Sequence, residues 1–289
     1  MEIDDTYCEA FDGLYSRTII TAKNEHYLKR AVLGATALPS TVVGRTEGGV
    51  EKWLGGNETP DGRPGALVQV WGKWSKNTSD FEYEYSLRIR QGVLVVPTTA
   101  IFNALDSDDR LDMMERVGHC GDGFEEVKHI HGREVISIPL MMGDFLIERY
   151  LGYKKGIMGG NIWFLCESEE AALQAGERAV GAVLNVDGAV TPFDICSAGS
   201  KVETNYPEIG PTTNHPYCPT LRGKIADSKV PEGVVSIPEI VINGTTLDAV
   251  REAMQAAIES AEGISEVLRV SAGNYGGKLG AHKIYLREL

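Results

Sequence analysis

The chain has 289 residues, of which 43% are hydrophobic and 24% charged, and its formal net charge at pH 7 is −13. A chain of this length can bury one large core or two of ordinary size. The acidic balance disfavours a nucleic-acid partner, because phosphate contacts need a positively charged surface. No apolar run approaches the roughly 18 residues that span a bilayer, so we expect no membrane segment. The acidic start, Met1–Asp5, is unlike a signal peptide and predicts a cytoplasmic protein.

The cysteines and histidines do not predict a bound metal. The five cysteines are scattered without a CxxC pair, which disfavours a zinc site and a disulfide framework. His129 and His131 share one face of a strand-like segment, and His119 precedes them, but no third ligand is evident. We therefore expect no metal and no bound cofactor.

The first half of the chain alternates strand-like and helical segments. β-Branched residues favour strands, and apolar residues at helical spacing favour helices. Asn24 can cap a helix that Pro39 ends. The expected order is strand, helix, strand, strand, helix, strand, over residues 16–21, 25–38, 41–43, 66–71, 80–90 and 92–96.

The second half repeats this order. Ser168 with Glu170 opens a helix, and Asn243-Gly244 is typical of a turn. The expected elements are strand, helix, strand, strand, helix and strand, over residues 162–166, 168–184, 189–191, 236–242, 247–261 and 267–270.

Two successive βαββαβ halves predict an α+β fold of two ferredoxin-like sandwich lobes. We place the boundary near Gly143, which gives lobes 1–143 and 144–289. The second lobe would carry the long loop 193–234, which shows little regular structure. Loops of such length are usually functional or interfacial.

The stretch Ser271–Gly280 contains four glycines directly after a predicted strand. Glycine at this density indicates a sharp bend or a close approach of the backbone to something else. A Walker-type phosphate loop is excluded, because only three residues, not four, separate Gly273 from Gly277-Lys278, and Leu279 follows. A turn between two C-terminal strands and a functional loop both fit the pattern.

Three strings, TPDGRPG (59–65), CPTLRG (218–223) and AGNYGGKLG (272–280), are long and specific. With them the chain resembles the formylmethanofuran:tetrahydromethanopterin formyltransferases of methanogenic and sulfate-reducing archaea and methylotrophic bacteria. The resemblance covers nearly the whole chain. Further matching pieces are Gly121-Asp-Gly123, Gly159-Gly-Asn161, Thr191-Pro-Phe193 and Gly199-Ser-Lys201.

The resemblance implies the same duplicated fold and a role in one-carbon metabolism. It implies reversible transfer of a formyl group between two co-substrates, formylmethanofuran and tetrahydromethanopterin. The pterin amine can attack the formyl carbon directly, so the oxyanion of the intermediate needs hydrogen-bond donors and protons must be moved. Such a reaction requires neither a metal nor an enzyme nucleophile.

Glu239 is the first candidate for a catalytic acid. It lies in the apolar segment Ile237–Ile242, where burial would hold its proton more tightly. Beside Pro238, it could instead be a charge on an exposed strand edge, and spacing alone favours that alternative. The matching glutamate of the family favours the catalytic role.

The remaining site candidates come from the loops. Asn274 is the second predicted catalytic residue, as an oxyanion donor. The predicted substrate-binding residues are Ser200, Lys201, Asn214, Gly273, Tyr275, Gly276, Gly277 and Lys278. Without the resemblance they would be turn and surface residues, like His215 beside them. Asp61 and Arg63 can form a turn that holds a cleft wall.

Three loops depart from the family pattern. Asp194–Ala198 replaces a Pro-Gly-Gly link, His119-Cys120 replaces Phe-Phe, and Val43–Gly49 differs from a Cys/Pro-containing stretch. The alternative function is therefore a diverged, non-catalytic or structural paralogue, for instance a subunit of a formyltransferase/hydrolase complex. The resemblance also implies a homodimer or homotetramer with the methanofuran cleft at a subunit interface.

Overall fold

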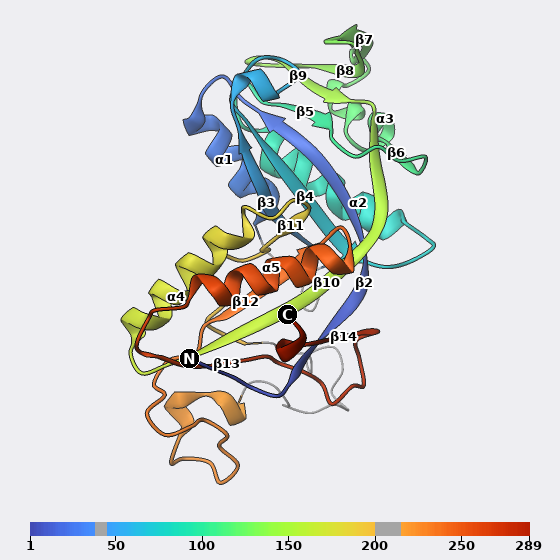
Figure 1. Cartoon of the computed structure of the whole chain (residues 1–289). Coiled ribbons are helices and arrows are strands. Elements are labelled where there is room, and N and C mark those ends of the chain that lie inside the picture. Colours follow the sequence, from blue (N-terminus) through green and yellow to red (C-terminus); the bar gives the residue numbers. More distant parts are fainter. Residues whose placement is uncertain (38–44, 200–214) are drawn as a thin grey trace. The chain divides into compact units, whose positions relative to one another are not determined.

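The computed structural model describes residues 1–37, 45–199 and 215–289 (Figure 1). These residues form two compact units. The N-terminal unit comprises residues 13–155, and the C-terminal unit comprises residues 1–12 and 156–289. The fold is α+β.

The division between the units falls inside two long strands, β2 (Tyr7–Thr21) and β10 (Tyr150–Cys166). It therefore differs from the boundary expected near Gly143, which is the first residue of β9. A strand that contributes residues to two units has no Pro- or Ser-rich linker, so the sequence carries no local signal of this division.

The N-terminal unit forms a four-stranded antiparallel ferredoxin-like sheet in the order β3-β4-β2-β5. β9 then extends the sheet parallel to β5, and β8 and β7 follow antiparallel. After the start in β2, its elements are α1 (Glu25–Thr36), β3 (Thr46–Leu54), β4 (Gly65–Lys73), α2 (Ser79–Arg88), a π-helical turn (Ile89–Leu94), β5 (Ala100–Asn103), β6 (Arg110–Asp112), α3 (Met113–Arg116), β7 (Glu126–Ile130), β8 (Arg133–Leu140) and β9 (Gly143–Glu148).

The helices of this unit bury their apolar stripes on one face of the sheet. Leu28 and Val32 of α1 and Phe81 of α2 join one core with alternate residues of β2 and β4. The side chain of Asn24 accepts a hydrogen bond from the backbone N–H of Tyr27, so the predicted cap is confirmed. The first two predicted helices and the strands at 16–21 and 66–71 are confirmed, whereas segment 41–43 lies outside the described residues.

The strand predicted at 92–96 is wrong, because the chain there continues α2 into the π-helical turn. An apolar run of this length fits a buried helix as well as a strand. The close approach of two backbones decides the matter: a Cβ on Gly92 would lie 2.5 Å from the carbonyl carbon of Gly34 in α1. The fourth strand of the motif is instead β5, after Thr98, whose φ is +68°.

The C-terminal unit repeats the ferredoxin-like order, with strands β11-β12-β10-β13 antiparallel. β1 joins β13 in parallel, and β14 pairs with the first part of β2. Its elements are β1 (Glu2–Ile3), the start of β2, the end of β10, α4 (Glu169–Val183), β11 (Ala189–Val190), β12 (Glu239–Gly244), α5 (Leu247–Ser260), β13 (Val267–Ser271) and β14 (His282–Tyr285).

Helices α4 and α5 lie side by side on one face of this sheet (Figure 1). Both predicted helices and the strands at 189–191 and 267–270 are confirmed, and the predicted strand 162–166 is the end of β10. The strand predicted at 236–242 is β12, displaced by a few residues, and the turn predicted at Asn243-Gly244 is wrong because both residues belong to it.

In the part of the chain that the structure describes, neither α4 nor α5 covers the other face of the C-terminal sheet, which holds the candidate site. Ile240 and Ile242 point into the core beneath α4 and α5. Trp163 and Leu165 instead form a small cluster with Val230 and Val234 from the segment that follows residue 215. We call this side of the sheet the helix-free face.

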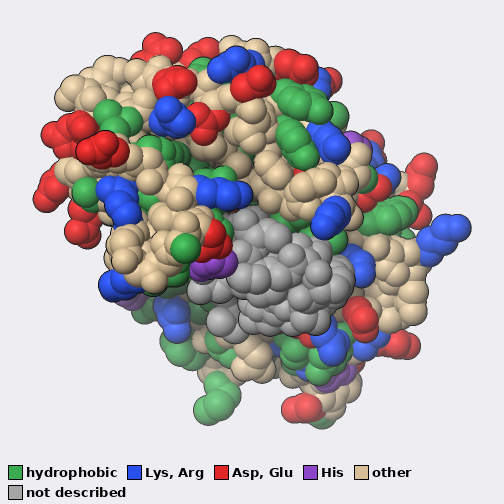
Figure 2. All heavy atoms as spheres, turned by 90° about the horizontal axis from the view of Figure 1, so that it is seen from below, with side chains coloured by type: hydrophobic (Ala, Val, Ile, Leu, Met, Phe, Trp, Pro, Cys, Tyr) green, Lys and Arg blue, Asp and Glu red, His purple; other side chains and the backbone are tan. Residues whose placement is uncertain are grey.

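On the surface seen in Figure 2, Lys and Arg side chains are interspersed with Asp and Glu. Among the described residues, no helix is long and apolar enough to cross a membrane.

Candidate functional site

Glu239 is a buried carboxylate on the helix-free face, with 2% of its surface exposed. Strand pairing places it opposite Trp163, whose indole Nε1–H donates to Oε1 of Glu239 at 3.0 Å. The backbone of Cys196 pairs with both backbone groups of Glu239 at 2.9 Å and so covers the strand edge. The alternative of an exposed edge charge is therefore wrong. Burial and the neighbouring Glu239 carboxylate raise the pKa of the Cys196 thiol.

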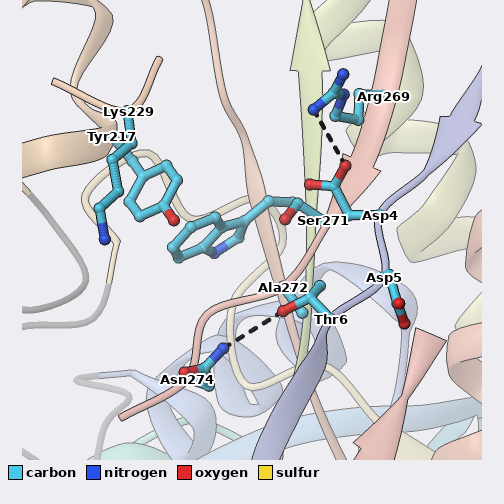
Figure 3. A pocket seen from close by; sticks show the side chains of 10 residues that line it. Asp4, Asp5, Thr6, Tyr217, Lys229, Arg269, Ser271, Ala272 and Asn274 are labelled. Carbon is cyan, nitrogen blue, oxygen red and sulfur yellow. Dashed lines mark hydrogen bonds and ion pairs between the residues drawn. The ribbon is translucent and has the colours of Figure 1, made fainter. Parts of the chain in front are cut away.

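The ring of Trp163 connects Glu239 to a polar pocket of about 400 Å³. Tyr217 packs edge-on against the indole, with ring centroids 4.8 Å apart, and the Lys229 ammonium lies 5.8 Å from the Tyr217 ring centre. Figure 3 shows Tyr217 and Lys229 on one side of the pocket and Arg269 on another. The pocket is lined by Asp4, Asp5, Thr6, Trp163, Tyr217, Lys229, Arg269, Ser271, Ala272 and Asn274.

Asn274 contributes its side-chain amide to this pocket (Figure 3). Among the residues that the structure describes, its Nδ2 makes two long hydrogen bonds, 3.4 Å to Oγ1 of Thr6 and 3.3 Å to the carbonyl oxygen of Tyr7. Its Oδ1 accepts the backbone N–H of Gly276 at 3.1 Å. The amide is thus oriented by its oxygen, and a stronger acceptor can draw its N–H groups away from these long contacts.

The backbone amides of the glycine-rich loop donate within the protein. The N–H of Gly273 donates to Oδ1 of Asn161 at 2.7 Å, and the N–H of Gly277 donates to a carboxylate oxygen of Glu9 at 2.5 Å. With Gly276 held by Asn274, the backbone amides of all three glycines predicted to bind substrate already have protein acceptors. Their hydrogen-bonding capacity is thus used within the protein, which disfavours them as oxyanion donors.

Sequence reasoning missed Glu9 of β2, which binds this loop. It is fully buried, and its carboxylate accepts four backbone N–H groups at 2.5 to 3.0 Å, from Tyr275, Gly277, Leu279 and Gly280. Burial alone raises the pKa of a carboxyl group, but these donors outweigh it and hold the pKa of Glu9 below its usual 4.5. The sequence feature that could have indicated Glu9 is an acidic residue between Cys8 and Ala10 in a strand-like segment.

The other predicted binding residues lie in different environments. Tyr275 is 6% exposed and its ring packs near Phe11, whereas Lys278 is exposed. Ser200, Lys201 and Asn214 lie outside the described residues. Nε2 of His215 lies 2.9 Å from a carboxylate oxygen of Asp227. Among the described residues, no group of three or more His, Cys, Asp and Glu side chains could hold a metal.

Two of the three distinctive strings build turns. Asp61 accepts hydrogen bonds from Arg63 and Thr21, and Arg63 also donates to the carbonyl oxygen of Thr98, so the expected Asp61–Arg63 turn is present. In the other string, Arg222 donates to the carbonyl oxygens of Pro231 and Val234. Both arginines therefore tie loop backbones together.

The two ferredoxin-like units, one of them with a buried carboxylate behind a polar pocket, define a two-lobed α+β protein. A family model described as formylmethanofuran-tetrahydromethanopterin formyltransferase matches residues 1–140, and one described as the proximal lobe of that protein matches residues 143–289. The chain belongs to the formylmethanofuran:tetrahydromethanopterin formyltransferase family.

Relatives and solved structures match this chain over nearly its full length. A formyltransferase-like protein of Archaeoglobus fulgidus is 61% identical over 99% of this chain and 96% of its own. The formyltransferase of Methanosarcina barkeri superposes with a TM-score of 0.90 at 38% identity, covering 100% of this chain and 98% of that one. A formyltransferase/hydrolase complex of Methylorubrum extorquens, solved with methylofuran, contains a chain with a TM-score of 0.87 and 33% identity, covering 99% and 96%.

Proposed function

We propose that this chain transfers a formyl group reversibly between formylmethanofuran and tetrahydromethanopterin. The observation that carries the proposal is the buried Glu239, held by the Trp163 indole at the wall of a polar pocket. It occurs in a chain that matches the family along both lobes.

The chemistry assigned to Glu239 is proton transfer. The pterin amine forms a bond to the formyl carbon, and the carbonyl oxygen becomes an oxyanion. The attacking nitrogen then loses its proton, and the departing methanofuran nitrogen gains one as its bond to carbon breaks. Glu239 accepts and returns this proton, and the Trp163 N–H fixes the orientation of its carboxylate.

Asn274 is the proposed oxyanion donor, because its long Nδ2 contacts leave it able to bind a developing negative charge. Lys278 is exposed on the same loop and Tyr275 is buried beside it, and we assign both to substrate binding. Ser200, Lys201 and Asn214 remain proposed ligands of the coenzymes. Gly273, Gly276 and Gly277 contribute by letting the backbone bend and approach closely.

The alternative is a diverged paralogue without this activity. It is favoured by one observation: identity to the formyltransferase-like relative, 61%, exceeds identity to the Methanosarcina barkeri enzyme, 38%. Such a paralogue would act as a structural subunit, for example in a complex of the formyltransferase/hydrolase kind.

Purified protein incubated with formylmethanofuran and tetrahydromethanopterin separates the two proposals. An active enzyme produces formylated pterin, followed by its absorbance, and Glu239→Gln serves as the matched inactive control. Folded wild-type protein that yields no product in either direction contradicts the enzymatic proposal and supports the paralogue.

We further propose a cytoplasmic homodimer or homotetramer with the methanofuran cleft at a subunit interface. Light scattering at assay concentration tests the assembly. An active monomer would exclude the shared cleft.

A further inference from the structure

The carboxylate of Glu9 occupies the centre of the glycine-rich loop. Oε1 accepts the N–H groups of Tyr275 and Gly277, and Oε2 accepts those of Leu279 and Gly280. Donor and acceptor are separated by 266 to 271 residues along the chain. The loop thus wraps its amides around an anion that the protein itself supplies, from the strand β2.

The backbone conformation of the loop suits this arrangement. Gly276 and Gly277 have φ values of +68° and +76°, a backbone conformation that lets the N–H groups on either side of Gly276, those of Tyr275 and Gly277, face one carboxylate oxygen. Packing is close, since a Cβ on Gly280 would lie 2.5 Å from the Cβ of Glu9. A fully buried carboxylate normally needs compensation, and four N–H donors provide it.

The same loop carries residues of the candidate site. Asn274, which lines the pocket, directly precedes Tyr275, whose backbone N–H is bound by Glu9. Gly273 on the other side packs against Trp163: a Cβ there would lie 2.7 Å from the indole ring. A displacement of the loop would therefore move both the proposed oxyanion donor and the partner of Glu239.

We propose that Glu9 is a positioning residue: its carboxylate fills the amide nest of residues 275–280 and thereby holds Asn274 at the reaction site before substrate binds. This inference rests on the proposed formyl transfer. Glu9 acts through the loop and does not touch the reacting atoms.

Glu9→Ala combined with chemical rescue tests the proposal. The substitution removes Cγ, Cδ and both carboxylate oxygens, which correspond atom for atom to acetate. Without acetate, we expect the amides of 275–280 to lose protection from hydrogen exchange and kcat to fall by about 10²-fold through misplacement of Asn274. Added acetate should restore both loop protection and kcat, with a smaller change in KM.

Two control variants test whether the rescue by acetate is specific to the site of Glu9. Asn274→Ala lowers activity without emptying the nest, so acetate should leave its kcat unchanged. Glu51→Gln alters another carboxylate that is only 3% exposed, in the N-terminal unit, and should leave the protection of residues 275–280 as in the wild type.

Two results would overturn the proposal. One is a folded Glu9→Ala protein with a protected loop and wild-type turnover. The other needs no variant: free exchange of the four loop amides in the wild type while those of Val267–Ser271 stay protected. The proposed function fails separately, when the wild type itself forms no formylated pterin.

Discussion

In each unit, the face of the sheet opposite its core α-helices holds a tryptophan near a buried carboxylate, and the surroundings of the two carboxylates differ. In the N-terminal unit, the indole of Trp71 donates to Oε1 of Gln69 at 2.9 Å, and Nε2 of Gln69 donates to Glu51 at 2.7 Å. Arg17 donates one hydrogen bond to each carboxylate oxygen of Glu51, at 2.5 and 2.7 Å. The charge of Glu51 is thus balanced by a fixed cation and an amide.

In the C-terminal unit, the Trp163 indole donates directly to Glu239 and its ring lines a pocket. The same topology thus holds one carboxylate inside a structural network and another behind a tryptophan ring that lines a pocket. A carboxylate paired with arginine contributes to stability, whereas one beside a pocket can exchange a proton with a bound molecule. Three measurements test this difference between the two carboxylates, and a fourth tests Glu9.

The largest expected effect is that of Glu239→Gln. The substitution keeps the shape and an acceptor for the Trp163 N–H but removes proton transfer, so we expect kcat to fall by about 10²–10⁴. Steady-state kinetics across pH check it, with most of the loss in kcat and little in either KM. Near-normal turnover with an unchanged pH profile would remove Glu239 from the mechanism.

Glu51→Gln should act on stability instead. The amide cannot match both oxygens of the carboxylate toward Arg17, so we expect the free energy of unfolding to fall by about 1–3 kcal/mol. Urea denaturation measures this loss, and kcat of the folded variant should stay near wild type. A large loss of kcat without a loss of stability would contradict the structural role of the network.

Two matched Trp→Phe variants compare the indole N–H groups. Trp163→Phe removes the hydrogen bond to Glu239 and should lower kcat by about tenfold. Trp71→Phe leaves the buried Gln69 oxygen without its indole donor and should cost about 1–3 kcal/mol of stability with kcat preserved. Equal losses of kcat in the two variants would contradict the proposed difference between the two tryptophan–carboxylate pairs.

The smallest effect concerns pH and Glu9. Because the folded-state pKa of Glu9 lies below 4.5, its contribution to stability is fully present above pH 4.5 and is lost as pH falls through the lowered value. The difference in unfolding free energy between wild type and Glu9→Gln should therefore shrink in this acid range. Lys283 of β14 pairs with Glu9 of β2, and the Asp12–His282 pair lies nearby. Wild type and Glu9→Gln both keep these groups, so the difference in their unfolding free energies reports on Glu9. A difference that is constant down to pH 3 would contradict the lowered pKa.

The sequence by itself determined the helices, their caps and the order of the two ferredoxin-like motifs. Asn24 caps α1, and Ser168 and Thr246 accept the backbone N–H groups that open α4 and α5. These signals are local, because a cap and an apolar stripe involve residues three or four positions apart. The long glycine- and proline-rich strings likewise sufficed to indicate the family.

The tertiary structure alone decided which residues surround the site. The run at 92–96 fits a strand until the backbone of α1 approaches Gly92, and the burial of Glu239 depends on the bridge from Cys196. Glu9 contacts the glycine-rich loop 266 residues away along the chain, and no pattern in either segment predicts this contact. Local periodicity cannot report such contacts, because their energy arises only when distant segments are folded together.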